Sequence, residues 1–352
     1  MLAARWHGRG DVRVETVERP TPNAGEVLLE VGWCGICGTD VEEYVEGPIT
    51  IPVGAPNAIT GRQAPLTLGH EFGGRVIEVG NGVSSVARGD RVAVEVCLSC
   101  GECAFCRTRR MALCSSWAAY GLQADGGLAE FVVVGADRCL PRPSSIDDRT
   151  AALVEPVEVA IRAVRKLAVQ PGDSAAVLGG GAIGLLAAQV LRAAGARPVL
   201  VITGQSLSID VARQLQLDVI DRRQNGWEGH LRDRTGALGP EVVIEAQGRG
   251  SSIGTAIRIA RKGGRIVITG IVVGDHPIDV VDLAVGEKHV MGSIQHEREA
   301  DLRPALGALA DGSVQVEPLI TGEIPLDRLV PDGLETLAGA DRRHVKLLVR
   351  TH

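Results

Sequence analysis

Ser174-Ala175-Ala176-Val177-Leu178-Gly179-Gly180-Gly181-Ala182-Ile183-Gly184 is the stretch that decides the fold of this chain. A short apolar strand runs into a glycine-rich turn, and the turn opens an alanine-rich helix expected from Ala182 to Ala194. The first glycine makes the tight turn, the second lets the backbone approach a pyrophosphate, and the third packs helix on strand. The helix N-terminus adds positive potential for phosphates. The stretch predicts a dinucleotide site with Gly179, Gly181, Ile183 and Gly184 at the cofactor; the alternative is a glycine-rich turn that binds nothing.

Strands and helices alternate around this turn, whereas the first 150 residues contain mainly short strands punctuated by Gly and Pro. Helical spacing is clear at 157–167, and further strands are expected at 199–202, 242–244 and 265–268. Such alternation predicts a parallel sheet with helices on both faces. The strands expected in the front part lie at 27–31, 74–80, 91–94 and 131–134. The fold class is therefore α/β, with a mostly-β domain and a doubly wound, Rossmann-type domain.

The end of the second strand of a dinucleotide domain normally carries a carboxylate that holds the ribose 2′-hydroxyl. Thr203 occupies that place here, so the repulsion that would exclude a 2′-phosphate is absent. Gln205 and Ser206 offer neutral donors beside it, and Arg222 and Arg223, after the next strand, could line the same pocket. The sequence favours NADP(H) over NAD(H), with Thr203, Gln205 and Ser206 at the cofactor. The alternative is NAD bound without the usual carboxylate.

Four thiols lie at short spacing in Cys100-x2-Cys103-x2-Cys106-x7-Cys114. Zinc prefers tetrahedral thiolate sets, and a closed four-cysteine shell is structural because it leaves no position for substrate. The pattern predicts a structural zinc at these four residues, against the alternative of four reduced thiols without metal. Cys97 has the same spacing to Cys100, so a ligand set shifted by one cysteine stays open.

Three separated pieces could form a second, open metal site. They are Cys37 in Cys34-Gly35-Ile36-Cys37, His70 with Glu71, and Glu155 before Pro156. A catalytic zinc takes three protein ligands and keeps one position for an alcohol oxygen. Each piece also has a simpler interpretation. Cys34 and Cys37 could be a redox pair, His70 a buried structural histidine, and Glu155 a helix-starting carboxylate.

Composition excludes several classes of function. The net charge of −6 is spread without runs of like charge, and aromatic residues make up only 3% of the chain, which argues against nucleic acid as a partner. No apolar stretch approaches the roughly 20 residues of a membrane span. The N-terminus lacks the apolar segment of a secretory signal. A cytoplasmic protein acting on a small molecule is expected, and its clustered cysteines are more typical of metal binding than of disulfides.

Cys37-Gly38-Thr39-Asp40, Gly69-His70-Glu71, Gly89-Asp90-Arg91-Val92, the four-cysteine loop and the glycine-rich turn follow one another in a familiar order. The chain resembles the zinc-containing medium-chain alcohol dehydrogenases over essentially its whole length. The resemblance implies a GroES-like catalytic domain of residues 1–155 and 296–352, with a Rossmann domain of residues 156–295 inserted. It implies that Cys37, His70 and Glu155 hold a catalytic zinc, with Glu71 as an exchangeable ligand, giving two zinc ions per chain. It also implies a homo-oligomer, either a dimer or a tetramer.

Glu155-Pro156, in place of a third-ligand cysteine, is similar to the polyol dehydrogenase branch, and residues 43–49 and 317–321 are similar to 2,3-butanediol dehydrogenases. The resemblance implies hydride transfer between NAD(P) and a secondary alcohol or ketone, of the vicinal diol, polyol or hydroxyketone type. The alcohol proton would pass through Thr39. A histidine usually follows three residues later, but this chain has Glu42, which is either the next member of the relay or a surface residue. Lys346 matches a position that contacts the cofactor pyrophosphate, unless it is a solvated charge.

Two other functions fit parts of the pattern. A zinc-independent double-bond reductase of the same superfamily would lack the metal ligands that are present here. A binding or structural protein that kept the fold without dehydrogenase activity would explain Glu42 and Thr203, but not the intact glycine-rich turn. The remaining histidines show no ligand spacing and are expected to be structural or exposed: His230, His276, His289, His296 and His344.

Overall fold

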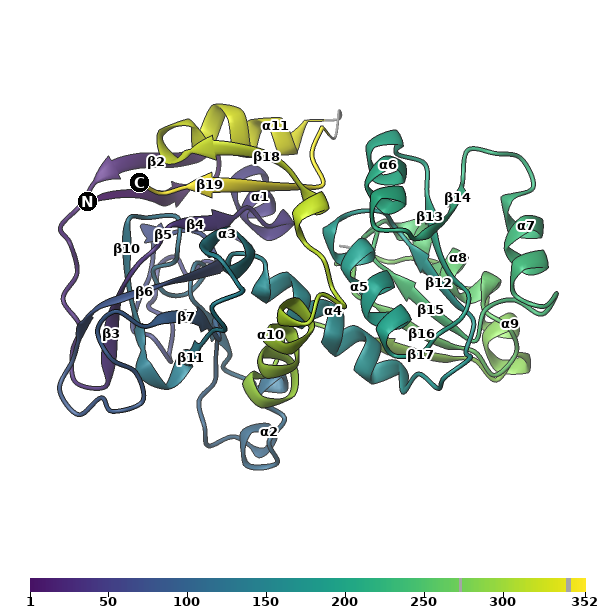
Figure 1. The fold of residues 1–352 in the computed structure, drawn as a ribbon, viewed down its shortest axis with the longest axis horizontal. Helices are drawn as coiled ribbons and strands as arrows, with labels where there is room; N and C mark the ends of the chain where they lie inside the picture. Colours follow the sequence, from purple (N-terminus) through teal and green to yellow (C-terminus); the bar gives the residue numbers. More distant parts are fainter. Residues whose placement is uncertain (272–273, 340–342) are drawn as a thin grey trace. The chain divides into compact units, whose positions relative to one another are not determined.

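The computed structural model describes residues 1–271, 274–339 and 343–352, and the chain divides into two compact units (Figure 1). Unit 1 comprises Met1–Glu155, His296–Ala310 and Ile320–His352, and unit 2 comprises Pro156–Gln295 and Asp311–Leu319. The sequence placed residues 311–319 with the catalytic domain, and here the structure differs. The Gln189 side chain donates to the Gln315 carbonyl at 3.0 Å and accepts from its amide at 2.8 Å, which ties this segment to unit 2.

Unit 2 is built on a six-stranded parallel sheet with the strand order β14-β13-β12-β15-β16-β17. Counted along the chain this is the order 3-2-1-4-5-6 of a doubly wound dinucleotide fold, so the predicted fold class is confirmed. The order reverses between β12 and β15, and ligands bind at the carboxyl ends of strands at such a switch point. The strands are β12 (Ala175–Leu178), β13 (Val199–Thr203), β14 (Asp218–Asp221), β15 (Val242–Glu245), β16 (Arg265–Ile268) and β17 (His289–Gly292).

The helices of this region connect successive strands, as parallel pairing requires. Helix α5 is buried along most of its length because its small and aliphatic residues pack on the sheet. The chain enters the unit through α4, which begins at Val154 in unit 1. The helices are α4 (Val154–Leu167), α5 (Ala182–Ala193), α6 (Ser206–Gln214), α7 (Trp227–Arg234), α8 (Gly250–Ile259) and α9 (Val280–Val285).

The turn between β12 and α5 needs its glycines. Gly179 has φ = 118°, a backbone conformation that favours glycine. A Cβ on Gly184 would lie 2.1 Å from the Gly179 carbonyl oxygen, so helix and turn approach each other only without a side chain there. The turn is therefore set by glycines at the two positions that the sequence pattern singled out.

Unit 1 is mostly β-structure, and it draws strands from both ends of the chain. Its largest sheet has eight strands, in which β6 pairs with β3, β4 and β7, and β19 from the C-terminal end pairs antiparallel with β4. Smaller sheets join β2-β1-β5 and β8-β9. The strands are β1 (Leu2–Gly8), β2 (Asp11–Thr16), β3 (Glu26–Glu30), β4 (Trp33–Gly35), β5 (Leu66–Thr67), β6 (Glu71–Val79), β7 (Arg91–Val94), β8 (Cys97–Leu98), β9 (Ala118–Ala119), β10 (Phe131–Gly135), β11 (Cys139–Pro141), β18 (Ile320–Pro325) and β19 (Lys346–Arg350).

Short helices close the edges of these sheets, and one core of valines, leucines and Trp6 fills the space between them. Alternation along the strands produces that core, as in β10, where Val132 and Val134 are buried. The helices are α1 (Gly38–Val45), α2 (Ala104–Arg107), α3 (Asp148–Ala151), α10 (Arg303–Ala310) and α11 (Glu335–Ala338). Across the three described ranges, none of the helices has the length and apolar character needed to span a bilayer.

Candidate zinc and dinucleotide sites

The structure brings the four cysteines of the predicted structural site together on one loop around α2. Each offers a sulfur within 4.8 Å of the other three. The Sγ···Sγ separation is 3.5 Å for Cys100 and Cys114, and 4.0 Å for each of the pairs Cys100–Cys106 and Cys103–Cys114. Zinc–sulfur bonds of about 2.3 Å place the edges of a tetrahedron at about 3.8 Å, so the set fits zinc. Cys97 stands apart from this quartet, which leaves Cys100 as its first member.

Backbone amides already point at these sulfurs. The amides of Cys103 and Cys106 donate to the sulfurs of Cys100 and Cys103 at 3.4 and 3.5 Å. Backbone donors, mainly the Cys106 amide, lower the pKa of Cys103 to about 6, whereas burial raises the pKa of Cys106 to about 11. Thiolates bind metal and thiols do not, so a loop that stabilises a thiolate is prepared for a cation.

The second candidate metal site begins at the N-terminus of α1. Asp40 accepts from the Cys37 amide at 2.9 Å through one oxygen, and its other oxygen lies 3.6 Å from His70 Nδ1. The carboxylate therefore fixes the cysteine and the imidazole together. Burial lowers the pKa of His70, but the negative charges of Asp40 and Cys37 outweigh it and leave the pKa well above its ordinary value. Cys37 and His70 thus share a buried place that favours positive charge.

Glu71, the predicted exchangeable ligand, is held by a lysine. Lys346 on β19 donates from Nζ to both Glu71 carboxylate oxygens at 2.7 Å and to the Ile36 carbonyl at 3.1 Å. Gly35 makes room for this pair, because a Cβ there would lie 2.0 Å from Glu71 Oε2. The sequence proposed that Lys346 contacts the cofactor pyrophosphate. The structure instead pairs the ammonium with three acceptors inside unit 1, not with a position open to a cofactor. Lys346 is correspondingly buried, with 6% of its surface exposed.

Glu155, the predicted third ligand, faces a histidine that the sequence did not single out. His296 Nε2 lies 3.3 Å from Glu155 Oε1 and 3.6 Å from Cys97 Sγ. Its Nδ1 lies 2.8 Å from Glu95 Oε1. Burial raises the pKa of Glu155, but His296 outweighs it and leaves the pKa below its ordinary value. Local spacing gave no signal for this cluster, because its members come from three distant segments.

The predicted relay residues lie on α1. Thr39 Oγ1 is 3.8 Å from Cys37 Sγ, so the hydroxyl is beside the candidate metal site. Glu42 follows three residues later and is exposed, and in the described part of the chain it shares no hydrogen bond with Thr39. Burial, followed by repulsion from Glu46 and Glu43, raises the pKa of Glu42. The structure therefore leaves Glu42 accessible to solvent with a weakened acidity.

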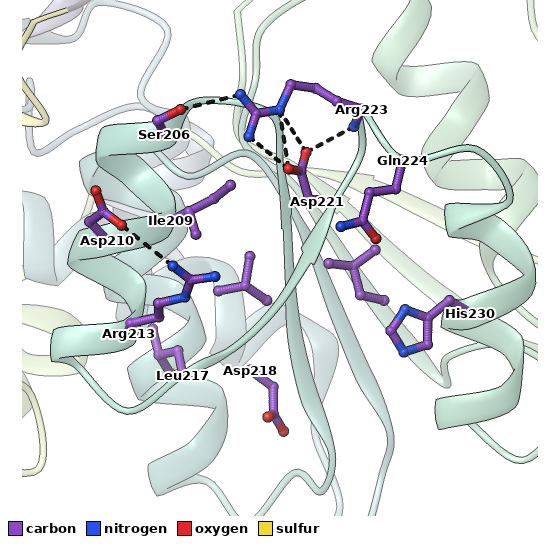
Figure 2. Close-up of a pocket in the computed structure, with 12 residues that line it drawn as sticks. Ser206, Ile209, Asp210, Arg213, Leu217, Asp218, Asp221, Arg223, Gln224 and His230 are labelled. Carbon is purple, nitrogen blue, oxygen red and sulfur yellow. Dashed lines mark hydrogen bonds and ion pairs between the residues drawn. The ribbon is translucent and has the colours of Figure 1, made fainter.

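The predicted cofactor residues of unit 2 gather beyond β13. Thr203 is buried at the strand end, and Gln205 precedes α6, which begins at Ser206. Figure 2 shows a pocket of about 450 Å³ between α6 and β14, in which Arg223 reaches Ser206 Oγ at 3.2 Å. The same guanidinium pairs with Asp221 at 2.7 Å, and Asp210 and Asp218 also line the pocket. An anion bound here would therefore have to pair with Arg223 at the Ser206 end of the pocket.

Comparisons with known proteins cover both units. The alcohol dehydrogenase GroES-like domain matches residues 23–144, and the zinc-binding dehydrogenase family matches residues 182–311. The chain is 36% identical to (R,R)-butanediol dehydrogenase of Bacillus subtilis strain 168, over 99% of each chain. The crystal structure of 2R,3R-butanediol dehydrogenase from Bacillus subtilis superimposes with a TM-score of 0.92, at 35% identity, covering 100% of this chain and 99% of that one. A putative zinc-binding dehydrogenase from Sinorhizobium meliloti 1021, bound to NADP, gives a TM-score of 0.88 at 31% identity, covering 99% and 98%.

Proposed function

The chain belongs to the zinc-binding alcohol dehydrogenase family and is an NAD(P)-dependent oxidoreductase; from this premise we propose that it interconverts a vicinal diol and the matching hydroxyketone with NADP(H). The observation that carries the proposal is the group formed by half-buried Cys37 and buried His70 and Asp40, which favours positive charge beside a hydroxyl on Thr39. We place the catalytic zinc at Cys37, His70 and Glu155, with Glu71 beside it, and the structural zinc at the four-cysteine loop.

The fit to zinc at the catalytic position rests on Cys37, His70 and Asp40. Among the described residues, neither Glu71 nor Glu155 forms with Cys37 and His70 a group whose ligand atoms all lie within 4.8 Å of one another. Asp40 Oδ1 and His70 Nδ1 are buried, 3.6 Å apart, and neither has another hydrogen-bond partner in the described residues. A carboxylate behind a histidine fixes the ring and raises its basicity as a ligand. When bound, the zinc polarises an alcohol oxygen and the nicotinamide accepts the hydride. The protein residues hold these groups and exclude water from them, which is the part of the chemistry that this chain supplies.

Thr39 provides the first step for the alcohol proton. Its hydroxyl lies 3.8 Å from Cys37 Sγ, and a hydroxyl can accept one proton while it donates another. Glu42 lies three residues further, on the same side of the helix. A carboxylate with a raised pKa is a better proton acceptor than an ordinary glutamate, so Glu42 can pass the proton to water.

The preference for NADP(H) rests on the residues that follow β13 and β14. Thr203 replaces the carboxylate that would hold a ribose 2′-hydroxyl, and Gln205 and Ser206 supply neutral donors. Arg223 approaches Ser206 and is positioned to pair with a 2′-phosphate. Arg222 packs beside it over Gly204, whose added Cβ would lie 3.1 Å from Arg222 Cγ. Two guanidinium groups at this place support the phosphorylated cofactor.

Two further expectations accompany this function. The eight cysteines carry no disulfide, which fits a reducing cytoplasm.

A homo-oligomer, dimeric or tetrameric, would cover the valines of α9, where Val281 is 71% exposed, and the neighbouring edge strand β17. Light scattering should then give a multiple of the 36.9 kDa chain mass, and a monomer would contradict the expectation.

The test is a titration of zinc-replete protein with NADPH and NADH, followed by addition of acetoin. We expect tighter binding of NADPH and oxidation of the bound cofactor when acetoin is added. Cys37→Ser should abolish turnover and retain cofactor binding, because unit 2 binds the dinucleotide; Cys139→Ala is the matched control and should retain both. Cofactor binding without turnover on any diol or hydroxyketone would refute the dehydrogenase proposal, and tighter NADH binding would refute the cofactor preference.

A further inference from the structure

We infer that Cys97, His296 and Glu155 form a further zinc position, oriented by Glu95 and separate from the sets centred on Cys37 and on the four-cysteine loop. Glu95, Cys97 and His296 each offer a ligand atom within 4.8 Å of the others. One thiol, one imidazole and carboxylates are a donor set suited to zinc, which accepts sulfur, nitrogen and oxygen together. The inference goes beyond the proposed function, although Glu155 is common to both.

The distances match the edges of a zinc tetrahedron. Zinc bonds of about 2.3 Å to sulfur and about 2.05 Å to nitrogen place those two atoms about 3.6 Å apart, and nitrogen and oxygen ligands are about 3.3 Å apart. His296 Nε2 lies 3.6 Å from Cys97 Sγ and 3.3 Å from Glu155 Oε1. The second separation is longer than an ordinary N–H···O hydrogen bond of about 2.9 Å. The imidazole nitrogen therefore lies at zinc-like spacing from one sulfur and from one carboxylate oxygen.

Glu95 supplies the support that a zinc-binding histidine requires. Its Oε1 lies 2.8 Å from His296 Nδ1 and accepts from the Cys97 amide at 3.0 Å. A histidine that ligates metal through one nitrogen usually donates its other N–H to a carboxylate or carbonyl. This single oxygen therefore lies against both proposed ligands, next to the imidazole nitrogen of His296 and at the amide of Cys97.

Burial supports a cation at this place. Glu95 and His296 are each 2% exposed, and Glu95 Oε2 has no hydrogen-bond partner in the described ranges of the chain. A buried carboxylate without compensation costs several kcal/mol of free energy. Glu155, which the proposed function assigns to the catalytic zinc, would then bridge the two ions, as carboxylates do in two-metal sites. Each thiol–imidazole pair would then share the same glutamate.

The experiment measures zinc per chain in dialysed, zinc-replete protein and in single variants. We expect three zinc ions in the wild type, two in Cys97→Ala, two in His296→Gln and three in Cys139→Ala, a control that also removes a buried thiol. Glu95→Gln should weaken this site about tenfold in competition with a chelator, because the amide still contacts the ring but no longer carries charge. Cys37→Ala should also lose one zinc, and this loss tests the catalytic site separately.

A second measurement identifies each site without relying on activity. In protein loaded with ¹¹³Cd, the four-sulfur site and the single-sulfur sites differ in chemical shift. We expect Cys97→Ala to remove one single-sulfur resonance and Cys37→Ala to remove the other. Equal metal content and equal spectra for the wild type and Cys97→Ala would overturn the inference and leave His296 as a bridge between Glu95 and Glu155. Loss of metal in Cys97→Ala but not in Cys37→Ala would support the inference and refute the proposed catalytic ligands.

Discussion

Replacement of Lys346 by methionine tests the buried pair on which the catalytic unit depends. The side chains of Lys346 and Glu71 are 6% and 2% exposed, and the ammonium has three acceptors at 2.7, 2.7 and 3.1 Å. Breaking a buried pair by removing one partner costs about 3–5 kcal/mol, because the other charge stays buried. Lys346→Met should therefore lower the free energy of unfolding of unit 1 by about 4 kcal/mol.

Urea denaturation in the presence of zinc measures this loss. Three of the four tryptophans, Trp6, Trp33 and Trp117, lie in unit 1, so intrinsic fluorescence reports mainly on its unfolding. With a slope of about 2 kcal/mol per molar urea, the midpoint should fall by about 2 M. The control is Arg91→Met in the same unit, since the side chains of Arg91 and its partner Asp148 are 54% and 41% exposed and Asp148 can be hydrated. Its loss should be clearly smaller.

A double-mutant cycle decides whether loss of the Lys346–Glu71 pair causes the loss of stability. Glu71→Gln combined with Lys346→Met removes both charges, so the double variant should be more stable than the sum of the single losses predicts. Additive losses, or a Lys346→Met midpoint equal to that of the wild type, would refute the reasoning. The earlier hypothesis that Lys346 contacts the pyrophosphate predicts the opposite pattern, with weakened NADPH binding and unchanged stability.

Three further predictions follow from the pocket, the relay and the cysteine loop. Arg223→Ala should weaken NADPH binding about tenfold and NADH binding little, because it removes the partner of the 2′-phosphate and leaves Asp221 uncompensated. Arg213→Ala in the same pocket is the control. Equal effects of Arg223→Ala on both cofactors in a binding titration would contradict the assignment. Glu42→Gln should remove the acid limb of the pH–rate profile, because Glu42 accepts a proton only when it is deprotonated. Since the pKa of Glu42 is raised, the acid limb of the wild type should lie above the ordinary glutamate pKa. An unchanged profile would make Glu42 a surface residue without a role in the relay. Cys103→Ala should lose one zinc and expose the 100–114 loop to limited proteolysis, and equal digestion rates would argue against a structural metal.

The fold could be predicted from the sequence wherever its signal is local. The apolar run before Gly179 and the alternation at 199–202, 242–244 and 265–268 placed β12, β13, β15 and β16, because each strand is defined by its own residues and its flanking turns. Strands β18 and β19 were not placed. They owe their existence to pairing across the chain, as when Leu348 meets Gly35, and no short window contains that information.

The same division holds for the candidate sites. The four cysteines lie within one loop, so their spacing alone indicated a shared ion, and the structure brings them together. Lys346 was interpreted differently from what the structure shows, and the partners of His296 were not foreseen, because both sets of partners depend on tertiary packing. The ammonium faces Glu71 across the β19–β4 junction, and the imidazole joins Glu95 to Glu155, which are far apart in the sequence. Sequence patterns locate ligands of one loop well, but they do not reveal pairs made by folding.

The charges of unit 1 connect these pairs into one argument. Four carboxylates with little exposure face three cationic or neutral nitrogen groups, in the contacts Asp40–His70, Glu71–Lys346 and Glu95–His296–Glu155. The carboxylates outnumber the nitrogen groups by one, and a thiol lies beside each imidazole. Buried negative charge of this kind is stable only when cations compensate it. Divalent ions at the two thiol–imidazole pairs would provide that compensation and turn both thiols into ligands. The stability of unit 1 and its metal content should therefore change together in every variant of these carboxylates, thiols and imidazoles.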